Sequence, residues 1–358
     1  MIFRMESRPQ DKSRGFFCVV GGGKMGLSHL ALITPYVGKD NVVLVERKLT
    51  VRCVFKLMGY QTFSDLDAVQ NKLGAPRGVI IATPTSTHAC LVEWALRNRI
   101  PCFVEKPLTL DAESSACLLR LARETGVFAQ TGFVMRYVHG FQRLRDLVED
   151  GRLGNLLSYS ASMRGNVMVK APEPENWQGD FKRGGGALNE YGPHLIDLCK
   201  FVFGDVTEVC YVDHGSIHCK HADDWITFDF NHKRGVNGRL QINWCDTSKR
   251  KSVIEIKAEF DGGVVRVDNS AFGVDFSDAC SLDIDARAKL REPNIPPTVG
   301  FFLRGEEFSL ELEDFLGHCL EQPLFSQGAV KNVVTPTLHD GHVVDQIIGD
   351  IAIKAGLK

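Results

Sequence analysis

The chain has 358 residues, with 42 Lys and Arg against 44 Asp and Glu, which gives a formal charge of −2. Because domains usually contain about 100–200 residues, this length predicts two domains. The balanced charge excludes a generally basic nucleic-acid-binding protein. A composition of 44% hydrophobic and 24% charged residues excludes the disordered and fibrous classes. No apolar run approaches the roughly 20 residues of a membrane span, so we expect no membrane partner. The balanced charge likewise leads us to expect no nucleic-acid partner.

The N-terminal segment and the cysteines indicate where the protein works. Residues 1–14 form a short polar tail without the apolar core of a signal peptide. The eleven cysteines are an odd number at irregular spacings, without a C-x-x-C motif. They predict small buried hydrophobic side chains in a reducing compartment rather than a disulfide framework. We therefore expect a cytoplasmic protein.

Residues 15–130 alternate short apolar runs with helical patterns. Strands are expected at Phe16–Val20, Val42–Val45, Gly78–Ala82, Cys102–Val104 and Val127–Gln130, and helical patterns lie between them, as at Leu91–Leu96 and Ser115–Ala122. Uninterrupted apolar strands separated by helices predict a parallel sheet covered on both faces. The fold class is therefore α/β, with this region as the first domain.

Residues 131–358 have a different pattern. Apolar and polar residues alternate over 225–230, 240–244 and 254–260, which predicts an antiparallel sheet with one face more exposed. Such a face often packs against a second copy, so we expect a homodimer or homotetramer. Residues 268–305 carry few regular signals and suggest a long loop or an arm. The apolar stripe over 343–352 predicts a C-terminal helix.

A glycine-rich segment follows the first strand directly. Gly21, Gly23 and Gly26 fit the pattern G-x-G-x-x-G, with Lys24 and Met25 inside it, and a helical stretch from Leu27 comes next. A sharp strand-to-helix turn with bare backbone lets helix N–H groups approach a pyrophosphate. Glu46 ends the second strand 20 residues after Gly26, where a carboxylate accepts hydrogen bonds from an adenosine ribose. This context predicts a dinucleotide site.

The residues after the second strand bear on the choice of nucleotide. Glu46 repels a 2′-phosphate and favours NAD. Arg47 and Lys48 follow it, and an arginine at this point can instead pair with that phosphate. We expect NAD, with NADP as the alternative.

Two more strands end in polar residues. Gly78–Ala82 is followed by Thr83-Pro84-Thr85-Ser86-Thr87-His88, and Cys102–Val104 by Glu105-Lys106-Pro107. Ligands of open parallel sheets bind beyond the carboxyl ends of the strands, so both segments are expected at the cofactor. A lysine there can polarise a substrate oxygen. Pro107 fixes its own φ, and an X-Pro bond can be cis, so the lysine can be presented rigidly.

A third segment combines three glycines with acid–base residues. Gly184-Gly185-Gly186 precede Glu190 and His194, which are four residues apart and share a face if the segment is helical. A carboxylate beside an imidazole suits proton transfer at neutral pH. Pro193 opposes helical geometry at Gly192, so the helix can instead start at Pro193 and leave Glu190 in a turn. Tyr191 is an alternative proton donor.

Taken in order, these motifs resemble the glucose–fructose oxidoreductase / inositol dehydrogenase / MocA family. The resemblance runs from about residue 15 to the C-terminus and implies a Rossmann dinucleotide-binding domain over 15–130. It also implies a C-terminal α/β domain over 131–358, with an open, mainly antiparallel sheet for substrate binding and oligomerisation, and with its last helices able to pack back on the first domain. The implied activity is NAD(P)-dependent hydride transfer to or from a secondary alcohol or ketone of a sugar, polyol or nucleotide sugar.

The resemblance also implies roles for single residues. Lys106 matches the catalytic lysine, His194 the usual acid/base, and Glu190 a position that is usually aspartate. Glu105, Thr83, Pro84 and His88 match positions that line the cofactor, which Lys106 also faces. Substrate contacts are expected from Arg136, Trp177, Arg183 and Tyr191.

Three alternatives remain open. A few relatives cleave glycosidic bonds with a retained NAD, and others are non-catalytic dinucleotide-binding sensors or regulators. The cluster His214, His218, Cys219 and His221 raises the question of a metal. Along a strand the first two face one side and the last two the other, so we expect no metal site.

Overall fold

The structure is a computed structural model, and it describes the whole chain except residues 1–14, 174–175, 279, 292–304, 323 and 325–333. The polar tail expected over 1–14 lies outside the described residues, as do residues 279 and 292–304 of the segment 268–305. The described part of that segment contains a strand (Phe272–Phe276) and a helix (Ile284–Arg291), so the expectation of a long loop or arm is wrong there. The chain divides into two compact units. Unit 1 comprises residues 1–105, 120–130 and 299–328, and unit 2 comprises residues 106–119, 131–298 and 329–358.

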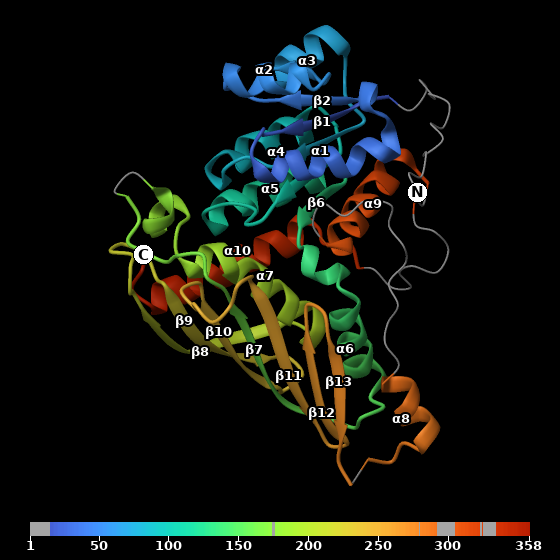
Figure 1. The fold of residues 1–358 in the computed structure, drawn as a ribbon, viewed down its shortest axis with the longest axis vertical. Helices are drawn as coiled ribbons and strands as arrows, with labels where there is room; N and C mark the ends of the chain where they lie inside the picture. The colour runs from blue at the N-terminus through green and yellow to red at the C-terminus, as the bar shows by residue number, and fades with distance from the viewer. Residues whose placement is uncertain (1–14, 174–175, 279, 292–304, 323, 325–333) are drawn as a thin grey trace. The chain divides into compact units, whose positions relative to one another are not determined.

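Unit 1 is built on a six-stranded sheet in the order β3-β2-β1-β4-β5-β6. Figure 1 labels β1, β2 and β6 of this sheet. The strands are β1 (Phe17–Val20), β2 (Val42–Val45), β3 (Gln61–Phe63), β4 (Gly78–Ile81), β5 (Cys102–Glu105) and β6 (Ala129–Gly132). The registered pairs from β3 through β5 are parallel. This confirms the expected parallel α/β sheet. β3 was not predicted because it has three residues, none of them buried.

Helices cover the sheet of unit 1. They are α1 (Lys24–Val37), α2 (Leu49–Leu57), α3 (Leu66–Leu73), α4 (His88–Arg97) and α9 (Glu306–Leu320), with short 3₁₀ turns η2 (Lys39–Asn41) and η3 (Thr85–Thr87). Helix α5 (Ala112–Thr125) begins in unit 2 and ends in unit 1. Phe17, Val19 and Phe103 share one buried cluster with α1 and with Phe315 of α9. The intervening strand residues, such as Cys18 and Val104, are also buried, so both faces of the sheet are covered.

Unit 2 contains a seven-stranded mixed sheet in the order β13-β12-β11-β7-β10-β9-β8. The strands are β7 (Leu156–Arg164), β8 (Val206–Gly215), β9 (Trp225–His232), β10 (Asn237–Asn243), β11 (Val253–Phe260), β12 (Gly263–Asp268) and β13 (Phe272–Phe276). β7 and β10 are parallel, and the other pairs are antiparallel. The expected mainly antiparallel sheet is confirmed, and β7 lies at its centre.

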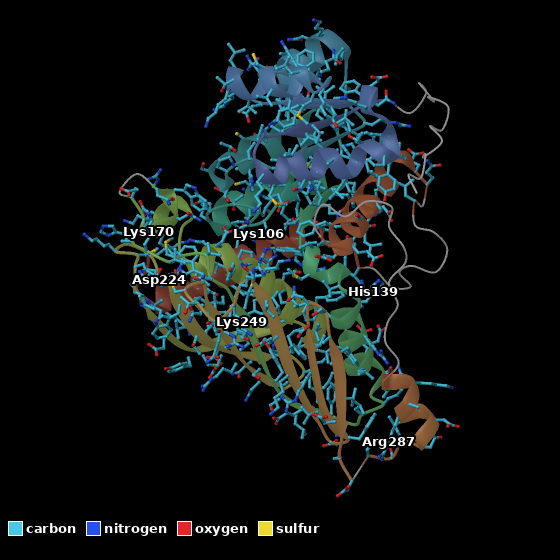
Figure 2. The ribbon with its side chains drawn as sticks, viewed as in Figure 1. Lys106, His139, Lys170, Asp224, Lys249 and Arg287 are labelled. Atoms are coloured by element: carbon cyan, nitrogen blue, oxygen red, sulfur yellow. The ribbon has the colours of Figure 1, made fainter. Side chains whose placement is uncertain are left out.

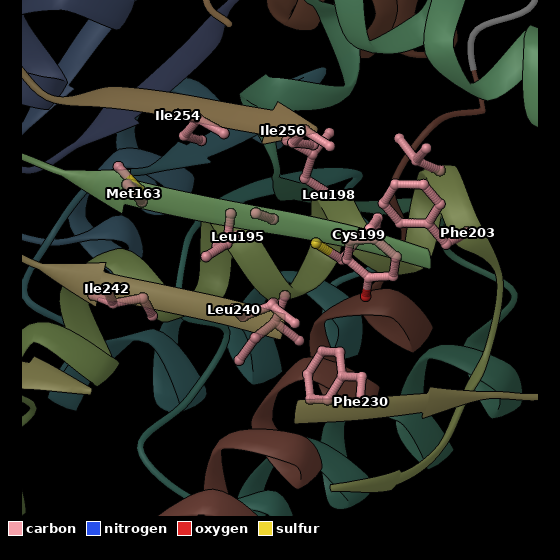
Figure 3. Packing of buried hydrophobic residues seen from close by; sticks show 14 of the residues in the cluster. Met163, Leu195, Leu198, Cys199, Phe203, Phe230, Leu240, Ile242, Ile254 and Ile256 are labelled. Atoms are coloured by element: carbon pink, nitrogen blue, oxygen red, sulfur yellow. The ribbon is translucent and has the colours of Figure 1, made fainter. Parts of the chain in front are cut away.

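One face of this sheet is covered by helices. The helices of unit 2 are α6 (His139–Asp150), α7 (Ala187–Phe203), α8 (Ile284–Arg291) and α10 (Leu338–Lys354), with 3₁₀ turns η4 (Val134–Tyr137), η5 (Trp177–Gly179) and η6 (Phe181–Arg183). Figure 3 shows α7 against the strands: Leu195 and Cys199 lie among Met163, Leu240 and Ile256. Helix α7, which packs into the core of unit 2, is therefore also the helix that carries Glu190 and His194.

All eleven cysteines are free thiols. Six are buried, whereas Cys53, Cys90, Cys117 and Cys210 are exposed. None of the helices in the described part of the chain has the length and apolarity that a membrane crossing requires.

Candidate active site

The glycine loop of unit 1 is a tight turn in which the backbone segments nearly touch. Gly21 has a φ of +104°, and a Cβ there would lie 2.5 Å from the carbonyl oxygen of Ala82. A Cβ on Gly26 would lie 1.8 Å from the carbonyl oxygen of Gly21. Both positions therefore require glycine, because any side chain would collide with backbone. Helix α1 begins at Lys24, earlier than the expected start at Leu27.

The same loop leaves room where a pyrophosphate would bind. A Cβ on Gly23 would meet no atom within 4 Å, in contrast to its neighbours. Gly23 is the N-cap of α1 and offers no side-chain cap, so the first N–H groups of the helix stay available. Open backbone N–H groups at a helix N-terminus suit a phosphate. The loop therefore fits a dinucleotide.

Glu46 is anchored at the end of β2. Its Oε2 accepts from the N–H of Gly22 at 2.7 Å, and its Oε1 from the N–H of Lys48 at 2.8 Å. A carboxylate accepts about four hydrogen bonds, so lone pairs remain for a ribose diol. Arg52, which sequence reasoning did not single out, donates to the carbonyl oxygens of Glu46 and Arg47 at 2.8 and 3.1 Å. Arg47 is exposed beside this turn.

The segment after β4 is held by its own side chains. Thr87 Oγ1 donates to Thr83 Oγ1 at 2.7 Å. The His88 ring lies 2.9 Å from the carbonyl oxygen of Thr83 and is buried. Pro84 precedes the turn η3 and is exposed. Thr83 and Pro84 thus remain candidates for a cofactor contact, whereas His88 supports the turn from within.

Glu105, at the end of β5, has a partner that the motifs did not indicate. Its Oε1 lies 2.7 Å from Nε2 of His29, whose side chain is fully buried in α1. His29 follows Gly26 by three residues, nearly one turn of helix. That spacing was the available signal, because it places His29 on the buried face of the helix that starts at the glycine loop.

Lys106 and Glu190 are brought together within unit 2. Lys106 Nζ donates to the backbone carbonyl oxygen of Glu190 at 2.8 Å and lies 3.4 Å from its Oε1. The Lys106 side chain is 11% exposed and that of Glu190 37%, so the ammonium is held inside while the carboxylate reaches solvent. The Lys106–Pro107 peptide bond is cis. Figure 2 labels Lys106.

Helix α7 begins at Ala187 and contains Pro193, so the alternative start at Pro193 is wrong. Glu190 and His194 therefore share a helix at the i, i+4 spacing. A proline within a helix removes one N–H donor and disturbs the turn before it. The carbonyl of Glu190 lies in that turn, and Lys106 binds to it.

His194 is half-buried, and its Nδ1 has no hydrogen-bond partner in the described part of the chain. Burial and the charge of Lys106 hold the pKa of His194 well below its ordinary value. We expected Glu190 to orient this ring. The structure instead directs the Glu190 carboxylate to Lys106, so the neighbour that sets the charge state of His194 is a cation.

The residues expected to contact substrate have different surroundings. Tyr191 is buried and its hydroxyl bonds to Ser252, and burial raises its pKa. Trp177 is 43% exposed, in η5, and Arg183 is exposed at the end of η6. Trp177 and Arg183 thus remain accessible.

Arg136 does not fit the expected substrate contact. It is 3% exposed, and its Nε bonds to Asp197 at 2.8 Å. Its Nη2 bonds to both Asp197 and Asp340. This buried ion-pair network occupies the guanidinium nitrogens that would otherwise bind a substrate. Arg136 therefore has a structural role in this network.

The described residues contain no group of three or more His, Cys, Asp or Glu side chains arranged to hold a metal ion. His214 lies near the end of β8, whereas Cys219 lies in the loop that follows, where its N–H donates to Asp224 Oδ2 at 3.0 Å.

Comparison with protein families agrees with this geometry. Residues 17–133 match a family described as "Oxidoreductase family, NAD-binding Rossmann fold". Residues 141–262 match one described as "GFO/IDH/MocA C-terminal domain".

Comparison with single proteins adds two relatives and one solved structure of the same fold. The chain is 30% identical over 202 residues to scyllo-inositol 2-dehydrogenase (NAD(+)) of Bacillus subtilis (strain 168), a match that covers 56% of each chain. It is 34% identical over 192 residues to inositol 2-dehydrogenase 1 of Mycolicibacterium vanbaalenii, which covers 52% of each. The matched part of the chain thus spans about half the length of these relatives. A solved structure of levoglucosan dehydrogenase in complex with NADH has the same fold, with a TM-score of 0.78, 19% identity and coverage of 96% of this chain and 97% of that one.

Proposed function

Because this chain belongs to the GFO/IDH/MocA family of oxidoreductases with an NAD-binding Rossmann fold, we propose that it transfers a hydride between NAD and a secondary alcohol or ketone. The substrate is a sugar, polyol or nucleotide sugar. Two relatives that are at least 30% identical over their matched parts are named as inositol dehydrogenases, which supports a polyhydroxylated substrate.

The observation that carries the proposal is the contact between Lys106 and Glu190, with His194 on the next turn of the same helix. It places an ammonium group, a carboxylate and an imidazole together in unit 2. Such a set suits proton transfer to and from an alcohol whose carbon gives up a hydride. A sensor that only binds a dinucleotide has no need of it.

Each of the three residues has a distinct part. Lys106 donates to the reacting oxygen and stabilises the negative charge that develops on it. His194 takes the hydroxyl proton in oxidation and returns it in reduction. Its low pKa keeps it neutral at neutral pH, as a proton acceptor must be. Glu190 directs the Lys106 ammonium.

The cofactor is held by the first 105 residues. The glycine loop and the N-terminus of α1 take the pyrophosphate, and Glu46 takes the adenosine ribose. When bound, the nicotinamide supplies or accepts the hydride. Thr83 follows β4 and Glu105 ends β5, two parallel neighbouring strands, and Lys106 follows Glu105 in the chain.

The test has two steps. Mass spectrometry of nucleotide released from the purified protein identifies the cofactor. Inositols, other polyols, aldoses and nucleotide sugars are then screened as substrates by the absorbance of reduced nicotinamide. Net NADH formation with a polyol or sugar supports the proposal. Product formation from a glycoside with no net NADH would instead support the glycosidase alternative, and no turnover with a bound nucleotide would support a sensor.

We also propose that the protein forms a homodimer or homotetramer in a reducing compartment such as the cytoplasm. The more exposed face of the unit 2 sheet, where every second residue of β9 and β11 is only partly buried, and the eleven free thiols support this. Light scattering of the purified protein measures the oligomeric state, and repeating it with and without reductant shows whether that state depends on free thiols.

A further inference from the structure

The helix that carries Glu190 and His194 receives its N-terminal cap from a distant loop. Gly186, the N-cap of α7, provides no side-chain cap. The carbonyl oxygen of Asp223 accepts from the N–H of Ala187 at 2.9 Å, and Asp223 Oδ2 accepts from the N–H of Leu188 at 2.8 Å. A helix start leaves four N–H groups without intrahelical partners, so one residue of another segment satisfies two of them.

The third glycine of the Gly184–Gly186 run makes this cap possible. Gly186 has a φ of +95°, and a Cβ there would lie 2.3 Å from Asp223 Oδ1. Any side chain at this position would therefore push the carboxylate away from the helix. Asp223 itself is fully buried. The glycine and the aspartate form one unit of packing at the start of α7.

The loop that presents Asp223 is itself fixed by the next residue. Asp224 Oδ2 accepts backbone N–H groups from three consecutive residues, Ile217–Cys219. Asp224 Oδ1 accepts from the indole N–H of buried Trp244 at 2.8 Å. Figure 2 labels Asp224. These bonds tie the loop to the end of β10, so Asp223 meets α7 from a rigid base.

We propose that Asp223 is a positioning residue for the reaction, which sets the first turn of α7 and thereby the placement of Glu190 and His194. Leu188, which it holds, precedes Glu190 by two residues, and Glu190 in turn binds Lys106. A displacement of about 1 Å in catalytic groups can cost roughly 10²-fold in rate. The proposal rests on the proposed function for its kinetic readout.

Asp223 also changes charge in the neutral range. Its Oδ1 has no hydrogen-bond partner among the described residues. Burial raises the pKa of Asp223 to about 7, with the N–H of Leu188 opposing and the charge of Asp224 adding to the rise. An ionised carboxylate is the stronger acceptor and is favoured at a helix N-terminus. The hydrogen bond from Leu188 to the Asp223 carboxylate therefore strengthens as the pH rises through about 7, while burial makes the ionised form of Asp223 unfavourable for the folded protein as a whole; His194 titrates well below that range.

The test compares Asp223→Ala with Asp223→Asn in the full-length chain. Asparagine caps helices as well as aspartate but does not titrate. Turnover is measured with NAD and scyllo-inositol, or with whichever compound of the screen is oxidised fastest, across the pH range. The matched control is Asp65→Ala, which removes a side-chain cap from α3 in unit 1, where Asp65 Oδ1 accepts from the N–H of Ala68 at 2.8 Å.

We expect Asp223→Ala to lower kcat by about tenfold or more, with the Kd of NADH unchanged. Asp223→Asn is expected to restore kcat to within about threefold of wild type at neutral pH and to lack the inflection near pH 7. Asp65→Ala is expected to keep the wild-type kcat. Wild-type kcat in Asp223→Ala, failure of asparagine to rescue, or an equal loss in the control would overturn the proposal.

A second readout does not depend on turnover. Titration of the His194 ring by NMR is expected to show its pKa moving back towards 6.5 in Asp223→Ala and staying low in Asp223→Asn. If no substrate turns over but this pattern is found, the proposed function fails and the positioning role stands. An unchanged His194 titration in Asp223→Ala contradicts the positioning role by itself.

Discussion

Lys106 Nζ is hydrogen-bonded at 2.8 Å to the backbone carbonyl oxygen of Glu190, a residue 84 positions further along the chain, and lies 3.4 Å from its carboxylate. The shorter of the two contacts is made by the backbone carbonyl of residue 190, which any amino acid at that position would provide. Two acceptors fix the ammonium in direction, and one N–H remains for a substrate oxygen. Burial, and after it the charge of Lys106, lowers the pKa of His194 on the next turn.

Replacing Lys106 by Met should lower kcat by about 10²-fold or more, the scale of losing one electrostatic donor to the reacting oxygen. The volume is nearly kept and the glycine loop is untouched, so the Kd of NADH should change little. Steady-state kinetics and a fluorescence titration of NADH measure the two quantities. Lys200→Met is a matched control, because Lys200 lies in the last turn of α7, its side chain is 10% exposed, and it pairs with Asp205 just after the helix. Equal kcat in both variants would remove Lys106 from the mechanism.

The pH dependence of alcohol oxidation should reflect neutral His194. Because burial and Lys106 lower its pKa, the fall in rate that His194 causes is expected well below about pH 6.5, separate from the inflection near pH 7 that Asp223 contributes. His194→Asn should lose about 10²–10⁴-fold in rate and lose this limb. In Lys106→Met the limb should move to higher pH, since one cause of the low pKa is gone. Profiles of kcat/KM against pH measure these shifts. If the fall in rate at acidic pH persists in His194→Asn, another group, such as Tyr191, takes the proton.

Glu46 should make the protein prefer NADH over NADPH. Its carboxylate is fixed by the N–H groups of Gly22 and Lys48 and would repel a 2′-phosphate. Glu46→Ser is expected to raise the Kd of NADH roughly tenfold, which corresponds to a loss of about 1.4 kcal/mol of hydrogen bonding. The variant is also expected to have a smaller preference for NADH over NADPH. Titrations of both cofactors with wild type and variant measure it. Tighter NADPH binding by the wild type would show that Arg47 dominates.

Asp345 should make stability fall as the pH rises from mildly acidic values. It is buried on α10, its Oδ2 accepts from the N–H and the hydroxyl of Thr109, and burial raises its pKa to about 8. Between the ordinary value of about 4 and this value, the folded state binds a proton that the unfolded chain releases, so the free energy of unfolding declines by up to about 1.4 kcal/mol per pH unit. Asp345→Asn removes this contribution.

Denaturant unfolding of both proteins at several pH values therefore gives a stability difference, wild type minus variant, that decreases from about pH 4 to 8. Parallel curves would show that Asp345 is ionised in the folded protein. Asp223 contributes in the same direction but is present in both proteins, so it cancels.

Local patterns determined much of the fold. The strand Val42–Val45 was predicted with its observed bounds, because a strand buried on both faces needs an unbroken apolar run. The glycine loop and Glu46 were found because a strand, a turn and a helix N-terminus are neighbours in sequence. The alternation over 254–260 likewise identified β11, since one face of that strand is buried and the other is not.

Tertiary structure decided the partners of the polar groups. Pro193 lies inside α7 although its own preference opposes a helix, because the apolar residues of that helix, such as Leu195 and Cys199, bury against the sheet. Arg136 meets Asp340, 204 residues away, and Asp223 caps a helix that starts 36 residues before it in the chain. No repeating pattern in the sequence indicates which hydrogen-bond partner a buried charged group will have. Burial makes each such group find a partner, and the folded chain alone determines which partner is within reach.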